Sequence, residues 1–152
     1  QYPILELTIH PRVRKQFYAG NVDMQTFHYA CSNSKNPLCY NGDLTNVAQI
    51  HAFAAAHPAI GAVMIGRGLI ADPGMLLPGG TDIVVLMDFM NALLESYLSA
   101  FGGGRNAMFR LKEHWHLLGP KLACDEKLLK RLYKTTDLQE YRTITAEIFH
   151  GI

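Results

Sequence analysis

Two short segments contain residue types suited to binding an anion. Tyr40-Asn41-Gly42-Asp43 and Ile65-Gly66-Arg67-Gly68 each follow an apolar run and precede a helical pattern. Glycine allows a backbone to approach a ligand closely, and arginine offers a planar fork of donors to a phosphate. Two such turns, one strand and one helix apart, favour a phosphate site over plain connecting turns.

A third segment adds positive charge. His10, Arg12, Arg14 and Lys15 directly follow an apolar, alternating run that ends at Ile9. In a sheet of parallel strands, ligands bind at the carboxyl ends of the strands. This segment is therefore either part of the same site or a solvated basic loop.

The elements that must position these segments are strands and helices in alternation, which predicts a parallel sheet with right-handed crossovers. The expected strands are 4–9, 38–40 and 62–65, and the expected helices are 25–32 and 44–57.

After Pro78 the pattern becomes helical. Four helices are expected: from Asp82 to 101, 106–118 closed by Gly119-Pro120, 125–133, and one to 150 that starts at a Thr136/Gln139 capping box. The predicted fold is therefore α/β plus all-α, with an α/β domain at 1–78 and a four-helix bundle at 79–152.

Charge is unevenly distributed. The net charge is +1, which excludes a general polycation, yet residues 105–134 contain eight cations and three acids. Lys127, Lys130, Arg131 and Lys134 fall on one face of the expected helix. Such a face is either an RNA-backbone footprint or simply solvated.

The remaining composition narrows the class of protein. Three widely spaced cysteines (Cys31, Cys39 and Cys124) give neither a disulfide framework nor a zinc pattern, so we expect a reducing cytoplasm and no metal. Asp88 and Glu95 interrupt the longest apolar stretch, so we expect no membrane span. The opening at Gln1, without an initiator Met, suggests a piece of a longer chain.

Three motifs, taken together, resemble one family. Thr8–Gly20, Tyr40–Leu44 and Met64–Gly74 resemble the segments that follow the sixth, seventh and eighth strands of tRNA-dihydrouridine synthases. The resemblance implies the C-terminal strands of a (β/α)8 TIM barrel followed by a helical tRNA-binding domain. It also implies reduction of a tRNA uridine to 5,6-dihydrouridine, with FMN recharged by NADPH.

The resemblance also implies roles for individual residues. His10 would contact the flavin ring. Arg12 and Arg14 would face the uridine or the RNA backbone. The residues expected to hold the cofactor's phosphate end are Asn41, Gly42, Asp43, Gly66 and Arg67. The four cations at 127–134 would contact tRNA.

The family's catalytic cysteine, and a lysine that helps bind flavin, belong to the first half of the barrel. The three cysteines here stand in other contexts, so we expect no catalytic residue in this chain, a fragment inactive by itself, and self-association through open sheet edges. Two alternatives remain: a non-catalytic RNA-binding module, and part of another FMN barrel oxidoreductase that acts on a small molecule.

Overall fold

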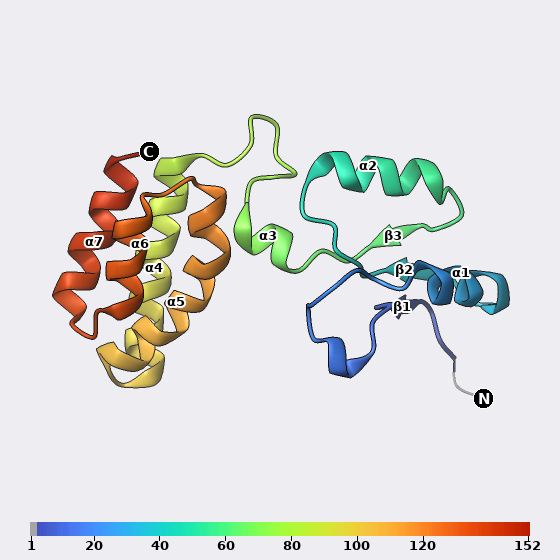
Figure 1. The fold of residues 1–152 in the computed structure, drawn as a ribbon, viewed down its shortest axis with the longest axis horizontal. Helices are drawn as coiled ribbons and strands as arrows, with labels where there is room; N and C mark the ends of the chain where they lie inside the picture. The colour runs from blue at the N-terminus through green and yellow to red at the C-terminus, as the bar shows by residue number, and fades with distance from the viewer. Residues whose placement is uncertain (1–2) are drawn as a thin grey trace. The chain divides into compact units, whose positions relative to one another are not determined.

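The computed structural model describes residues 3–152, which leaves Gln1 and Tyr2 outside the described part. The chain forms two compact units, one up to Gly68 and the other Leu69–Ile152 (Figure 1). The division between the units therefore falls ten residues before the expected domain boundary at residue 78, and that boundary stays a prediction.

The first unit alternates strands and helices. Its elements are β1 (Leu7–Ile9), the 3-10 turn η1 (Arg14–Gln16), α1 (Met24–Asn33), β2 (Leu38–Tyr40), α2 (Val47–Ala56) and β3 (Ala62–Val63). The short helix α3 (Arg67–Ala71) spans the division between the units. The strands are parallel, in the order β1-β2-β3, which confirms the expected strand–helix–strand pattern.

The strand register brings the carboxyl ends of all three strands to one edge of the sheet. Ile9 is level with Tyr40, and Tyr40 is level with Val63. The strand expected at 4–9 is shorter than predicted because its pairing begins at Leu7, whose N–H donates to Pro37 O at 2.9 Å. Pro37 has no backbone N–H to donate to the first strand, so the hydrogen-bonded ladder does not extend toward residue 4.

Three aromatic rings form the core of this unit. Phe27 of α1 packs edge-on against Tyr40 of β2 at 4.8 Å, and Phe53 of α2 stacks on the same ring at 4.1 Å. Because both helices contact one side chain of the central strand, α1 and α2 cover the same face of the sheet.

The second unit is helical. It contains α4 (Ile83–Phe101), α5 (Gly104–Lys121), α6 (Glu126–Lys134) and α7 (Leu138–His150), which agree with the expected helices within a few residues. Aspartates cap three of them, because their carboxylates accept hydrogen bonds from first-turn N–H groups. These caps are Asp82, Asp125 and Asp137.

Two local predictions in this unit are wrong. The Asp137 carboxylate, rather than the Thr136/Gln139 box, caps α7 and accepts from the Glu140 N–H at 2.7 Å. Helix α5 also continues past Gly119-Pro120, because a proline near a helix end removes a single hydrogen bond. The carbonyl of Gly119 is still satisfied, by the Cys124 N–H at 3.2 Å.

The helical core is built around Trp115, whose side chain is fully buried. Its indole Nε1–H donates to the Tyr141 hydroxyl at 2.9 Å, so the one polar atom of the ring is satisfied. Neighbouring buried side chains come from all four helices and include Leu94, Leu111, Leu132 and Ile144.

Helix α4 is long and apolar enough to cross a membrane by length and composition, which corrects the expectation that acidic residues exclude it. Leu86, Met90 and Leu94 use part of this apolar character to fill the helical core, while Val85 and Phe89 are exposed. A single helix of this kind is weak evidence of a membrane span, and the absence of a membrane stays a prediction.

Candidate anion-binding site at the carboxyl edge of the sheet

The three loops that follow β1, β2 and β3 enclose a pocket of about 220 Å³. The strand register explains why these loops lie close together, because all three leave the same edge of the sheet. Every residue that the sequence analysis assigned to the cofactor lines this pocket: His10, Asn41, Gly42, Asp43, Gly66 and Arg67.

Charge in this pocket is arranged around one carboxylate. Asp43 lies between two guanidinium groups: its Oδ1 accepts from Arg67 Nη2 at 2.6 Å, and its Oδ2 pairs with Arg12. Two cations and one anion leave a net charge of +1. The Arg67 side chain is 36% exposed, so this excess charge can reach a ligand.

Tyr18 is a lining residue that the sequence analysis missed. The Arg67 guanidinium lies 4.1 Å from the centre of the Tyr18 ring, which is close enough for a cation–π contact. Leu44 and Thr45 also line the pocket and were not expected. Tyr18 stands within the basic segment that begins at His10, but only folding brings its ring to Arg67.

Arg12 and Arg14 differ in their surroundings. The Arg12 side chain is 1% exposed, and its guanidinium donates to Ala19 O at 2.7 Å and Gly20 O at 2.8 Å besides Asp43. Arg12 therefore fastens the loop after β1 to the loop after β2. Arg14 lies exposed in η1. An RNA or uridine contact by either arginine stays a prediction.

The glycines of these loops differ in the space that surrounds them. A side chain at Gly42 would collide with the Tyr40 ring, and one at Gly68 would lie 2.8 Å from Leu44 O. A Cβ at Gly66 would meet no atom within 4 Å, although Gly66 lines the pocket. Internal packing therefore requires Gly42 and Gly68, whereas Gly66 leaves open space next to Arg67.

His10 presents one ring nitrogen to the pocket. Its Nδ1 lies within hydrogen-bonding distance of Asn41 O, and a carbonyl only accepts, so Nδ1 carries the proton in this contact. In the neutral ring, Nε2 is then the nitrogen left to face a ligand. The contact also fixes the imidazole against the loop that follows β2.

These features fit a phosphate monoester. The net positive charge, the exposed Arg67 fork and the open space at Gly66 suit a doubly charged, tetrahedral group. The Asp43 carboxylate would repel such a group if it were unpaired, but its two arginine partners compensate its charge. The residues present therefore suit the phosphate end of FMN.

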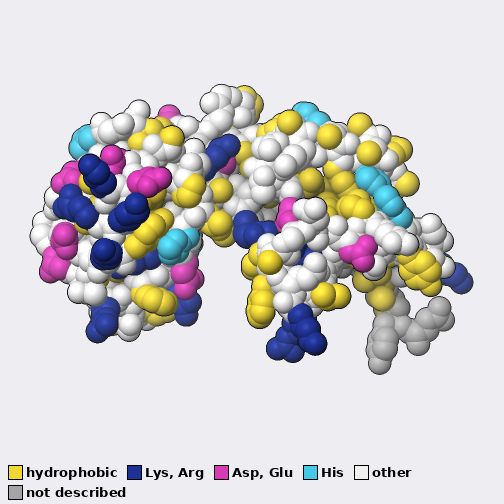
Figure 2. All heavy atoms as spheres, viewed as in Figure 1, with side chains coloured by type: hydrophobic (Ala, Val, Ile, Leu, Met, Phe, Trp, Pro, Cys, Tyr) yellow, Lys and Arg dark blue, Asp and Glu magenta, His cyan; other side chains and the backbone are white. Residues whose placement is uncertain are grey.

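The second predicted site lies on α6. Lys127, Lys130, Arg131 and Lys134 are all exposed, and Figure 2 shows Lys and Arg gathered over the helical unit with Asp and Glu between them. Lys130 pairs with Glu126 at 3.2 Å, and Arg131 with Glu147 at 3.3 Å. Within residues 3–152, Lys127 and Lys134 form no such pair.

None of the cysteines has a nucleophile's surroundings. Cys39 is buried in β2, and Cys31 and Cys124 are partly buried, all as free thiols. Burial raises the pKa of the Cys124 thiol, which disfavours the reactive thiolate. Among the described residues, no three His, Cys, Asp or Glu side chains gather as metal ligands.

Comparison with known proteins points to one family. The sequence profile described as Dihydrouridine synthase (Dus) matches residues 4–83, which include all three loops. Two proteins named probable tRNA-dihydrouridine synthase, from Rickettsia bellii and Rickettsia conorii, are 37% and 36% identical over 70 residues. These alignments cover 46% of this chain and 21% of each relative.

A longer alignment reaches into the helical unit. A protein of the same name from Rhodobacter capsulatus is 30% identical over 110 residues, which are 63% of this chain and 33% of that protein. The chain thus spans well under half the length of these relatives. On the profile match, which takes in more than half of the sequence, the chain belongs to the dihydrouridine synthase family.

Proposed function

We propose that this chain supplies the phosphate side of the flavin site and the tRNA-binding helices of a tRNA-dihydrouridine synthase. The whole enzyme would reduce a uridine in tRNA to 5,6-dihydrouridine. The observation that carries the proposal is the single pocket in which the loops after β1, β2 and β3 meet, all three within the family match.

The sheet supports a barrel as the parent fold. Consecutive parallel strands with both crossover helices on one face fit a segment of a (β/α)8 barrel. We infer that β1, β2 and β3 are three of its eight strands and that α4–α7 form a four-helix bundle. Three strands cannot close a barrel, so we further propose that this chain alone does not catalyse the reduction.

FMN is the proposed cofactor and NADPH the proposed reductant. Bound FMN, once reduced, supplies the reducing equivalents for the uridine C5–C6 double bond. Arg67, Asn41 and the backbone at Gly42 and Gly66 would hold the phosphate, with Asp43 fixing the Arg67 fork. His10, held by Asn41 O, would direct Nε2 toward the flavin ring.

tRNA is the proposed partner of the helical unit, where the unpaired Lys127 and Lys134 would contact phosphates. A cytoplasmic location belongs to the same proposal and is supported by three free thiols.

The test is chemical analysis of tRNA from cells with and without the gene. We expect dihydrouridine to disappear from at least one tRNA position on deletion and to return with the native gene but not with Arg67→Ala. Lys35→Ala, at an exposed cation between α1 and β2 that lies outside the pocket, is the control. Unchanged dihydrouridine at every position after deletion would reject the enzyme proposal and leave the non-catalytic RNA-binding reading.

A further inference from the structure

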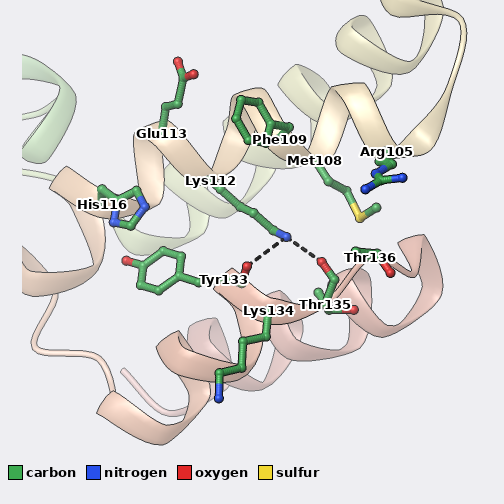
Figure 3. Close-up of a pocket in the computed structure, with 10 residues that line it drawn as sticks. All are labelled: Arg105, Met108, Phe109, Lys112, Glu113, His116, Tyr133, Lys134, Thr135 and Thr136. Atoms are coloured by element: carbon green, nitrogen blue, oxygen red, sulfur yellow. Dashed lines mark hydrogen bonds between the residues drawn. The ribbon is translucent and has the colours of Figure 1, made fainter.

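The helical unit contains a second pocket, of about 310 Å³, and Lys134 is the one lining residue to which a role is assigned above. One wall is α5, and the other is the end of α6 with the turn into α7. Figure 3 shows Arg105, Phe109 and Lys112 on α5 and Tyr133 to Thr136 on the other wall, with Lys112 pointing across to Tyr133 and Thr135. We call it the Arg105 pocket. Its volume is in the range of small-ligand sites.

Lys112 lies at the base of the Arg105 pocket. Its ammonium donates to Tyr133 O at 3.2 Å and to Thr135 O, the last carbonyls of α6. An ammonium has three N–H donors, so one remains for a ligand. The contact also explains why a partly desolvated lysine is retained there: it caps the negative end of α6.

Arg105 has no comparable structural explanation. It is exposed and forms no ion pair or side-chain hydrogen bond with any residue from 3 to 152. It also lies in the first turn of α5, where the helix dipole disfavours a cation. Lys134, on the opposite wall, is likewise free of ion pairs among these residues. Glu113 also lines the pocket, but it pairs with Arg110 at 3.4 Å. The three lining cations Arg105, Lys112 and Lys134 therefore outnumber the one lining anion.

An exposed aromatic ring stands beside these cations. Phe109 is 66% exposed, although it lines the pocket and lies one turn from Arg105 on α5. His116 and Tyr133 stack at 4.2 Å and form a further flat wall. Aromatic faces next to unpaired cations are the combination that binds unstacked bases together with their phosphates.

We propose that the Arg105 pocket binds one unstacked nucleotide of the RNA, with its base on Phe109 and its phosphate at Arg105 and Lys112. This rests on the proposed tRNA function and adds a contact distinct from the cationic face of α6. A duplex keeps its bases stacked, so the pocket selects a loop or a strand end.

The test compares variants of the full chain in binding an unmodified tRNA transcript, a single-stranded oligonucleotide and a duplex of equal length. Phe109→Leu should weaken tRNA and single-strand binding by about fivefold or more, the lower range for one stacked base, and leave duplex binding unchanged. Arg105→Ala should weaken tRNA binding and single-strand binding. It should also lower the slope of log affinity against log salt concentration by about one. Circular dichroism verifies that each variant is folded.

Two matched variants serve as controls. Lys121→Ala removes an exposed cation of α5 that pairs with Asp72 and lies outside the pocket, and Phe89→Leu removes an exposed ring of α4. Both should bind RNA as the parent does. If Phe109→Leu and Arg105→Ala behave like these controls, the pocket inference is wrong while the tRNA proposal stands.

Other outcomes separate the two ideas further. A parent chain that binds no tRNA would overturn both the pocket inference and the tRNA part of the proposed function. Equal weakening of duplex and single-strand binding by Phe109→Leu would overturn base stacking. Poly-glutamate, added at the same charge concentration as the RNA, serves as a competitor. If it displaces the RNA, and Phe109→Leu does not change RNA binding, the ligand is an acidic protein instead.

Discussion

The two units bury very different cores although they are similar in length. The core of the helical unit contains fourteen buried side chains from four helices, whereas that of the α/β unit contains four, Tyr40 among them. Its first strand, β1, lies at a sheet edge where Leu5 is 91% exposed and Leu7 39% exposed. The helical unit packs its helices around one shared core, whereas the α/β unit leaves apolar side chains exposed at its edge strand.

This difference matches how each unit would work. A helical domain closes its own hydrophobic face and can present cations to a partner. A barrel segment places functional residues at strand ends, and the remaining strands must cover its edges. Five measurements can break or sharpen this comparison.

The largest effect expected is on molecular mass. Because β1 and β3 both have open parallel edges, we expect sedimentation velocity to give species heavier than 17.0 kDa that grow with concentration. Leu7→Lys, which places a charge on the β1 edge, should shift the population toward monomer. A parent chain that stays at 17.0 kDa at all concentrations would contradict the open-edge interpretation.

Trp115→Ala tests the helical core. The side chain is fully buried, so its loss should lower the free energy of unfolding by about 3–5 kcal/mol. Urea titration followed by far-UV circular dichroism measures this, since the variant has no tryptophan fluorescence. Phe109→Ala, at 66% exposure, should change stability by no more than about 0.5 kcal/mol. Equal effects would show that the core is not built as described.

Tyr141→Phe tests the buried hydrogen bond. It leaves the Trp115 N–H without an acceptor and should cost about 1–3 kcal/mol in unfolding free energy at neutral pH. Burial raises the pKa of the Tyr141 phenol. The unfolded chain then ionises first, near its ordinary value of about 10, so parental stability falls as pH rises above that value.

The variant lacks this ionisation. The difference in stability between the parent and Tyr141→Phe should therefore be constant below about pH 10 and narrow above it. A gap that stays constant in alkali would mean that the hydroxyl is not buried in the folded state.

Two glycines of the α/β unit provide a matched pair. A methyl group at position 68 would meet backbone atoms of Leu44 and Thr45, so Gly68→Ala should destabilise by about 1–3 kcal/mol. The methyl group of Gly66→Ala would occupy open space and should change the free energy of unfolding by no more than about 0.5 kcal/mol. The same variant, made in the protein expressed from its own gene, should bind FMN more weakly. Unchanged flavin affinity in Gly66→Ala would remove Gly66 from the site.

The smallest effect concerns the cations of α6. Replacing the unpaired Lys127 and Lys134 with Ala should lower the salt slope of tRNA binding by about two, as expected for two lost phosphate contacts. Replacing Lys130 and Arg131, which already pair with glutamates, should lower it less. Equal slopes for the two double variants would show that these ion pairs do not influence RNA contacts.

Local patterns in the sequence were enough to place most elements. Apolar periodicity and glycine or proline breaks locate all four long helices of the second unit. The failures arise where two local signals compete: Asp137 is a stronger acceptor than the neighbouring threonine, and Pro120 is close enough to a helix end to be tolerated. Strand length failed at β1 because it depends on Pro37, a residue of the partner strand.

By itself, the sequence determined which residues meet at the sheet edge. His10, Asn41 and Arg67 each follow a strand, and parallel strands in consecutive order must bring their carboxyl ends together. Only the tertiary structure decided that Arg12 is buried as a brace for Asp43, that Tyr18 lies on Arg67, and that Arg105 and Phe109 flank a pocket. These depend on side-chain packing between distant segments, which periodicity along one segment does not encode.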